Sequence, residues 1–162
     1  MPYETRNRGL LPSVLDRLID AQSEAPQAQE STHLHNLQQV KQAVTRDLEA
    51  LLNTRREYMK DLPPEFVETR QSLVHYGLPD FSALSLQSNQ DRNRIRRVLE
   101  QTVALFEPRL ERVRVALELP REHEQTLRFR IDAMLRVEPA PEPVTFDARL
   151  LNTQEYVVKE NA

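Results

Sequence analysis

Apolar residues recur with the spacing of an amphipathic helix in three parts of the chain. The spacing i, i+3, i+4, i+7 predicts helices over about residues 13–21, 33–53 and 89–106. The inner faces of the two longer helices carry Leu37, Val40, Val44, Leu48 and Leu51, and then Ile95, Val98, Leu99, Thr102, Val103 and Phe106. Prolines and a glycine interrupt the pattern between them, where one short helix fits between Pro64 and Tyr76.

The first helix is expected to be an arm outside the main domain. Its apolar positions are Leu11, Val14, Leu15, Leu18 and Ile19. The polar stretch "AQSEAPQAQEST" that follows, at residues 21–32, has no periodicity and is typical of a linker. A helix this short is unstable alone, so it folds back on its own domain or docks into a groove of a partner protein, and we favour the partner. Its polar face, with Asp16, Arg17 and Asp20, lacks the basic stripe of a membrane-surface helix.

After residue 110 the period of the apolar positions changes from 3.6 to 2. Three stretches alternate apolar and polar residues, and turn-prone "PREHEQ" and "EPAPEP" separate them. Their apolar positions are Val113, Val115, Leu117 and Leu119; Leu127, Phe129, Ile131, Ala133 and Leu135; and Val144, Phe146, Ala148 and Leu150. The pattern predicts an α+β fold in which helices pack on one face of a small three-stranded antiparallel sheet.

These elements suggest a division into three parts. Residues 1–32 form the arm and its linker, residues 33–151 form the α+β domain, and residues 152–162 form a C-terminal tail. The tail either extends the third strand or hangs free. The outer face of the sheet carries Arg112, Arg114, Arg128, Arg130, Asp132, Asp147 and Arg149, which would face water or a partner.

Composition removes several classes of function. The chain has no cysteine, which excludes disulfides, thiolate zinc sites and thiol nucleophiles. Its only glycines, Gly9 and Gly77, cannot build a glycine-rich phosphate loop or a dinucleotide-binding fingerprint. Apolar runs are too short to cross a bilayer, and no signal peptide is recognisable at the N-terminus, so a cytoplasmic location without membrane insertion fits.

The stretch "LFEPRL", at residues 105–110, raises the question of catalysis by Glu107. In an extended segment Glu107 and Arg109 would point to the same side and meet. A neighbouring guanidinium favours the charged form of a carboxyl group, whereas a general acid must hold its proton. Pro108 excludes helical geometry at Glu107 and fixes the pair where helix gives way to strand. We therefore expect a structural or interfacial ion pair.

Other candidate chemistry is weaker. Arg92, Arg96 and Arg97 near the start of the third helix could contact phosphates, but the interleaved aromatic residues that stack bases are missing and the net charge is −3. The histidines lack the i, i+4 spacing of a helical zinc site. We expect no nucleic acid, no metal and no cofactor.

Four stretches in order carry a resemblance to a known family. They are "LLPSVLDRLID" near the start, "DLEALLNTRR" at 47–56, "YGLPDFS" at 76–82 and "EPRL" at 107–110. Together they resemble the TssE family, the type VI secretion baseplate subunits related to a baseplate wedge protein of contractile-tailed phages. The resemblance implies a non-catalytic structural protein in the cytoplasmic baseplate, together with TssF, TssG and TssK. From this baseplate the sheath of TssB and TssC assembles, and the subunit's sheet is expected to template the first sheath ring.

The resemblance also implies roles for individual residues. Glu107, Pro108 and Arg109 match the family's signature, which is linked to stabilising the sheath contact. Asn53, Thr54, Arg55 and Arg56 would lie at a structural or interfacial turn. The arm becomes a candidate for docking to TssF or TssG. Because the family has also been described as lysozyme-like, a muramidase remains the alternative function.

Overall fold

The computed structural model describes residues 14, 15, 18, 37–57, 63, 65–118, 127–138, 140–150 and 155–161. Within these ranges the helices are α2 (Leu37–Asn53), α3 (Val67–Gln71), the 3-10 helix η1 (Leu73–His75) and α4 (Asn89–Phe106). The strands are β1 (Leu110–Leu117), β2 (Arg128–Leu135), β3 (Glu142–Leu150) and β4 (Tyr156–Asn161). The α+β class predicted from the sequence is confirmed, and α4 spans the predicted residues.

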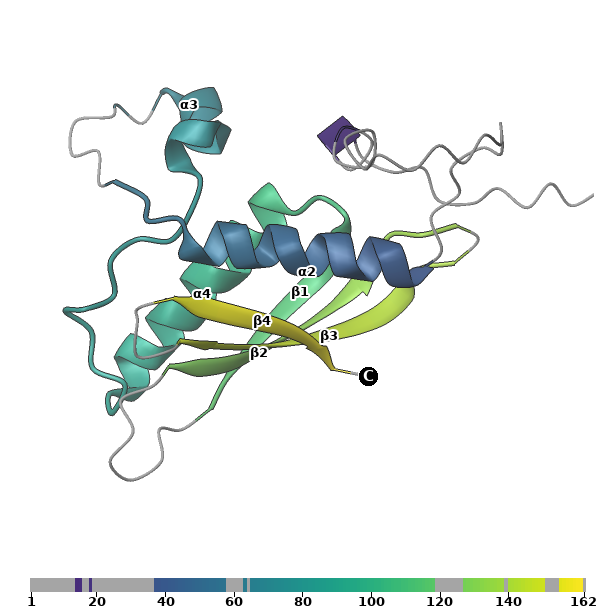
Figure 1. Ribbon diagram of the computed structural model, residues 1–162. Coiled ribbons are helices and arrows are strands. Elements are labelled where there is room, and N and C mark those ends of the chain that lie inside the picture. The colour runs from purple at the N-terminus through teal and green to yellow at the C-terminus, as the bar shows by residue number, and fades with distance from the viewer. Residues whose placement is uncertain are drawn as a thin grey trace, which may run out of the picture.

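The sheet is antiparallel with the strand order β1-β2-β3-β4 (Figure 1). The expectation of three strands is wrong, because residues set apart as a tail form β4. This strand pairs with β3 in a register that sets Tyr156 opposite Leu150 and Val158 opposite Ala148. Its six residues carry apolar side chains on too few alternating positions to predict a strand. The free edge of β3 supplies the hydrogen bonds that the pattern alone does not reveal.

One hydrophobic core joins the helices and the sheet. Helix α4 contacts β1 and helix α2 contacts β4. Fully buried side chains come from both helices and from the alternating positions of the strands. They include Val44, Leu48, Leu99, Val103, Ile131 and Phe146, each with no exposed surface. Burial of side chains of this size is the main favourable contribution to folding.

Local sequence signals explain where α4 begins and how it reaches the sheet. Ser88 caps its N-terminus, and the Ser88 hydroxyl accepts a hydrogen bond from the backbone N–H of Asp91. The helix ends at Phe106, and its C-cap Glu107 directly precedes Pro108. Within the described ranges, no helix combines the length and the apolar character needed to span a bilayer.

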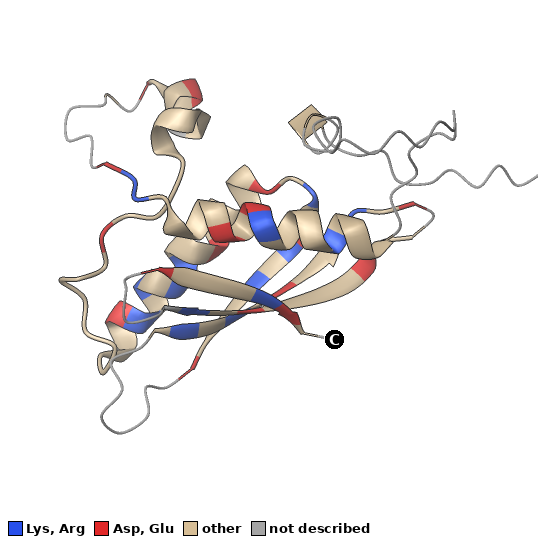
Figure 2. Ribbon diagram, in the orientation of Figure 1, with Lys and Arg blue, Asp and Glu red and all other residues tan. Residues whose placement is uncertain are grey.

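The outer face of the sheet is charged and internally paired. Arg130 on β2 forms an ion pair with Asp147 on β3 at 3.2 Å, and Asn161 on β4 donates to the same carboxylate at 2.7 Å. Figure 2 shows basic and acidic residues interleaved along the strands and α2. Strand β1 differs from its neighbours, because a register shift lies between Glu111 and Arg114 and Arg112 has a φ of +53°.

Candidate functional site

The segment 107–109 forms a turn between α4 and β1. Glu107 leaves helical geometry with a φ of −119° and a ψ of 79°, and its backbone N–H still bonds to the carbonyl of Val103. The carbonyl of Glu107 then accepts from the N–H of Leu110 at 3.0 Å. The predicted ion pair is present, but the extended geometry proposed for it is wrong. A tight turn around Pro108, rather than strand alternation, brings the two side chains together.

An ionic cluster of Asp47, Glu107 and Arg109 fixes α2 to the start of β1. Arg109 Nε lies 2.7 Å from Glu107 Oε1, and Arg109 Nη2 lies 2.5 Å from Glu107 Oε2. The same Nη2 lies 2.5 Å from Asp47 Oδ2 on α2. The backbone N–H of Arg109 also donates to Glu107 Oε1. The guanidinium of Arg109 therefore reaches a carboxylate that lies 62 positions away in the chain.

Burial decides what this ionic cluster can do. Glu107 is only 3% exposed, whereas the side chains of Arg109 and Asp47 are 28% and 30% exposed. The fork of Arg109 is matched to both oxygens of the buried carboxylate, which is the strong, charge-assisted geometry. The hydrogen bond with Glu107 raises the pKa of Arg109. These contacts suit a fixed ion pair, because both oxygens of Glu107 are bonded to Arg109.

An aromatic pair lies beside the ionic cluster. Tyr76 and Phe106 meet edge to face, with ring centroids 5.3 Å apart and an interplanar angle of 73°. Burial raises the pKa of Tyr76, and the negative charges of Asp47 and Glu107 raise it further. The effect of both carboxylates on Tyr76 places its hydroxyl within electrostatic reach of the ionic cluster.

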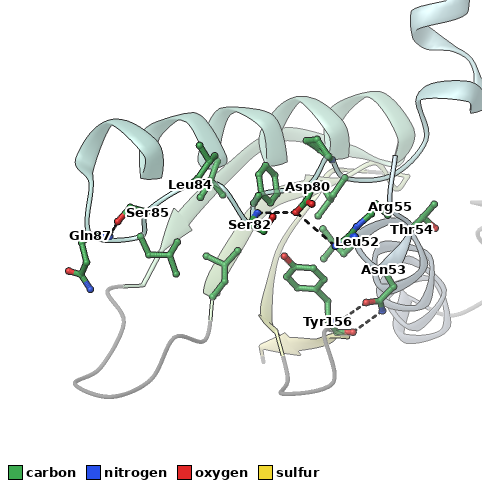
Figure 3. A pocket seen from close by; sticks show the side chains of 16 residues that line it. Leu52, Asn53, Thr54, Arg55, Asp80, Ser82, Leu84, Ser85, Gln87 and Tyr156 are labelled. Atoms are coloured by element: carbon green, nitrogen blue, oxygen red, sulfur yellow. Dashed lines mark hydrogen bonds and ion pairs between the residues drawn. The ribbon is translucent and has the colours of Figure 1, made fainter. Parts of the chain in front are cut away.

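The second candidate, the turn of Asn53, Thr54, Arg55 and Arg56, fastens α2 to β4. Asn53 Nδ2 donates to the carbonyl of Tyr156 at 2.9 Å, and Tyr156 N–H donates to Asn53 Oδ1 at 2.6 Å (Figure 3). A side-chain amide has a donor and an acceptor in the same arrangement as a peptide group. Asn53 therefore occupies the place of a neighbouring strand at the start of β4.

The same turn also binds the loop that contains "YGLPDFS". Leu78 N–H donates to the carbonyl of Thr54 and Arg56 N–H donates to the carbonyl of Leu78, both at 2.8 Å. Gly77 permits this approach with a φ of +100°, and a Cβ at this position would lie 2.3 Å from the carbonyl oxygen of Thr54. Two stretches that are 20 residues apart in the sequence thus form one backbone junction.

A cavity of about 510 Å³ opens beside this junction (Figure 3). Apolar side chains line its interior, among them Leu52, Leu78, Phe81, Leu84, Ile95 and Tyr156. Arg55 and Asp80 lie at its polar side, 3.9 Å apart. The backbone N–H of Ser82 lowers the pKa of Asp80. The pattern of apolar residues did not predict this cavity, because its walls come from five separate segments.

The remaining candidates are scattered. Of the predicted arm, Val14, Leu15 and Leu18 are helical and 72%, 55% and 61% exposed, while Leu11 and Ile19 lie outside the described residues. Arg92 donates to the carbonyl of Leu86, and Arg96 donates to both oxygens of Glu100. Two of the three arginines considered for phosphate binding are therefore engaged within the protein.

Three residues that complete these sites were not predicted from the sequence: Asp47, Tyr76 and Tyr156. Asp47 and Tyr76 carried no spacing signal toward Glu107, because each lies far from it along the chain. The bond between Asn53 and Tyr156 was also missed, since it joins α2 to a strand that was not predicted. Two of these three residues lie in stretches that the sequence analysis had quoted as motifs: Asp47 in "DLEALLNTRR" and Tyr76 in "YGLPDFS".

Residues 38–140 match the family described as baseplate wedge protein gp25. The match includes all of α2 except its first residue, the backbone junction at Gly77 and the ionic cluster. The chain belongs to this family. No curated protein matches the chain. Membership in the baseplate wedge family makes the protein a structural component of a baseplate, where it contacts other baseplate components.

Proposed function

We propose that this baseplate wedge protein is the TssE-type subunit of a type VI secretion system. In this role it has no catalytic activity, connects the wedge complex to the tail sheath and provides the template on which the sheath assembles. Its partners would be TssF, TssG and TssK in the baseplate and TssB and TssC in the sheath, all on the cytoplasmic side of the membrane.

The family match over residues 38–140 carries this proposal. Three of the four stretches that resemble TssE lie within it, and the structure gives two of them, "LLNTRR" and "YGLPDFS", a shared junction. The fourth stretch lies in the arm. Its exposed Val14, Leu15 and Leu18 support an arm that docks to TssF or TssG, because an amphipathic helix gains stability by burying its apolar face in a groove.

The signature Glu107, Pro108 and Arg109 would act indirectly at the sheath contact. Glu107 is buried, so it stabilises the turn that begins β1 instead of touching a partner. Pro108 is exposed and Arg109 is partly exposed. The ionic cluster would hold α2 and the sheet in the one arrangement that sheath subunits recognise.

Sheath assembly in cells tests the proposal. In a strain that lacks this chain, fluorescently labelled TssB should form no extended sheaths, and the wild-type gene should restore them. The purified chain should also elute together with a TssF–TssG complex on size exclusion. Sheaths that form normally without the chain would contradict the proposed function.

The muramidase alternative has its own test. Purified chain should release no soluble fragments from peptidoglycan above the level of a Glu107→Gln variant, because Glu107 is held by Arg109. Release by the wild type that disappears in Glu107→Gln would establish catalysis and overturn the structural proposal.

A further inference from the structure

The cavity beside the backbone junction contains a polar group without a partner. Tyr156 is only 9% exposed, and its ring extends from β4 into the cavity, toward the loop of Asp80 and Ser82 (Figure 3). The backbone of Tyr156 bonds to Asn53, but no hydrogen bond joins its hydroxyl to any residue that the structure describes. Buried tyrosine hydroxyls usually have a hydrogen-bond partner. The cavity therefore suits an occupant that brings one polar group together with apolar surface.

The walls of the cavity supply the apolar part of such a site. Its volume of about 510 Å³ lies within the range of pockets that enclose a ligand or several side chains. Phe81, Leu84 and Leu86 are only partly buried against the core, so an occupant would remove more of their surface from water. The other apolar side chains of the walls are Leu52, Leu78, Ile95 and Leu127.

The N-terminal arm carries the matching chemistry. Val14, Leu15 and Leu18 are helical, share one face of the helix and are each more than half exposed. A helix this short needs a groove for its apolar face in order to be stable. By helical spacing Asp16 borders this face, and its carboxylate can accept a hydrogen bond from the Tyr156 hydroxyl.

The chain between the arm and α2 is long enough to bring the arm to the cavity of the same molecule. The cavity lies at the C-terminal end of α2, and the arm is joined to the N-terminal end at Leu37. Helix α2 has 17 residues and is therefore about 25 Å long. Residues 19–36 can span about 60 Å when extended. A tether of this kind gives an effective concentration on the order of millimolar, which favours the arm of the same chain over that of a second copy.

We propose that in the free chain the N-terminal arm crosses α2 and docks its apolar face into this cavity, where Asp16 accepts from the Tyr156 hydroxyl. The cavity thus holds the arm and covers its apolar face until a partner binds. In the baseplate the arm would leave the cavity and dock to TssF or TssG. This second step rests on the proposed function, whereas docking in the free chain does not.

A spin label on the arm tests where it docks. The chain has no cysteine, so Asp20→Cys carries a nitroxide at one place, on the polar face of the arm. The label should remove most of the amide signals of Leu84 and Ser85 in nuclear magnetic resonance spectra of the full chain. The signal of Glu142 should remain, because Glu142 lies at the opposite end of β3 from the residue that pairs with Tyr156. Loss at Glu142 in place of Leu84 and Ser85 would overturn the inference.

The matched control removes the apolar face of the arm and leaves the cavity intact. With Leu15→Asp and Leu18→Asp in the labelled chain, the signals of Leu84 and Ser85 should return. Both substituted residues are exposed, so the α+β domain keeps its fold. Signals that stay lost in this variant would show that the apolar face does not hold the arm and would overturn the inference.

Trypsin gives a second readout, because it cleaves after Arg17 and its rate follows the population of free arm. Leu84→Trp fills the cavity and should raise the rate of this cleavage at least about tenfold. Tyr156→Phe removes the hydroxyl alone and should raise it about two- to tenfold, as expected for one hydrogen bond. Ala104→Trp is the control, since Ala104 is exposed on α4 and does not line the cavity, and it should be cleaved like the wild type. Folded Leu84→Trp with unchanged cleavage would overturn the inference.

A mixture of two chains tests the remaining occupant. Spin-labelled chain is added to isotope-labelled chain that carries no nitroxide, and the signals of Leu84 and Ser85 in the second chain should be unaffected. Their loss would assign the cavity to the arm of a second copy and overturn the inference. All of these measurements use the purified chain alone. They can therefore fail while sheath formation still requires the chain, and the arm can dock even if the proposed function is wrong.

Discussion

Besides the ion pair of Lys41 with Glu160, helix α2 is fastened to the sheet at two places, by two different kinds of contact. At β1 the fastening is ionic, with Arg109 between the buried Glu107 and Asp47. At β4 it is neutral, with the amide of Asn53 bonded to the backbone of Tyr156. Both contacts join residues that are distant in the sequence. They differ in the kind of polar group that is left without a partner when one side chain is removed.

The difference lies in the free energy of the group left behind. Without Arg109, the Glu107 carboxylate would stay buried with no countercharge, and an uncompensated buried charge is strongly destabilising. Without the Asn53 amide, the N–H and the carbonyl of Tyr156 at the edge of the sheet would form hydrogen bonds with water instead. We therefore expect the ionic contact of Arg109 to be essential for folding. The neutral contact of Asn53 is expected to have a smaller effect on stability and to hold the first residue of β4 in place.

The largest effect is expected from Arg109→Met. This variant keeps much of the aliphatic stem and removes the charge that holds Glu107, so the free energy of unfolding should fall by about 3–5 kcal/mol. Urea unfolding followed by circular dichroism measures the loss. Arg130→Met is the matched control, because its ion pair with Asp147 lies in solvent, and its stability should stay near that of the wild type. Equal losses in the two variants would contradict the role given to burial.

Gly77→Ala is expected to have the second-largest effect on stability. It tests the backbone junction between Thr54 and Leu78, which directly follows Asn53. A side chain at a φ of +100° is strained, and its Cβ would collide with the carbonyl of Thr54. We expect a loss of about 2–3 kcal/mol in thermal or urea unfolding. Ser82→Ala, at an exposed position of the same loop, serves as the control for a small side-chain change. A Gly77→Ala protein as stable as the wild type would show that the loop is not fixed to α2.

Asn53→Ala should destabilise the protein by about 1–2 kcal/mol, because two neutral hydrogen bonds are lost at a partly exposed place. Hydrogen exchange at the Tyr156 amide should accelerate at the same time. Asn53→Asp separates the two bonds, since its carboxylate still accepts from Tyr156 N–H but cannot donate to the carbonyl. Its stability should not exceed that of the wild type. A loss from Asn53→Ala as large as that from Arg109→Met would remove the distinction between the two fastenings.

The smallest effect concerns pH. Burial and the nearby carboxylates raise the pKa of Tyr76 above its ordinary value. The neutral phenol therefore contributes stability that is complete below about pH 10 and is lost as the pH rises through the raised value. The stability of Tyr76→Phe should fall less than that of the wild type as the pH rises above about 10. Burial also raises the pKa of Tyr156, so part of the pH dependence should remain in the variant.

The predictable parts of this protein are those in which neighbours in the sequence decide the structure. Residues 89–106 became α4 as predicted, because Ser88 supplies a cap, the apolar stripe sets the buried face and Pro108 lies just beyond the end. The alternation of Phe129, Ile131, Ala133 and Leu135 likewise predicted the buried face of β2. The pairing of Glu107 with Arg109 was expected for the same reason, since only one residue separates them.

The tertiary structure decided everything that depends on residues meeting across the fold. Strand β4 has a weak pattern of its own and forms because β3 offers an edge and Asn53 holds its first residue. Asp47 joined the ionic cluster because packing of α2 placed it beside Arg109. Periodicity determines which face of a segment is buried, but hydrogen bonds and ion pairs between distant segments depend on how those faces pack. The sequence therefore determined the elements and their buried faces, while packing determined the fastenings of α2 and the pairing of β4 with β3.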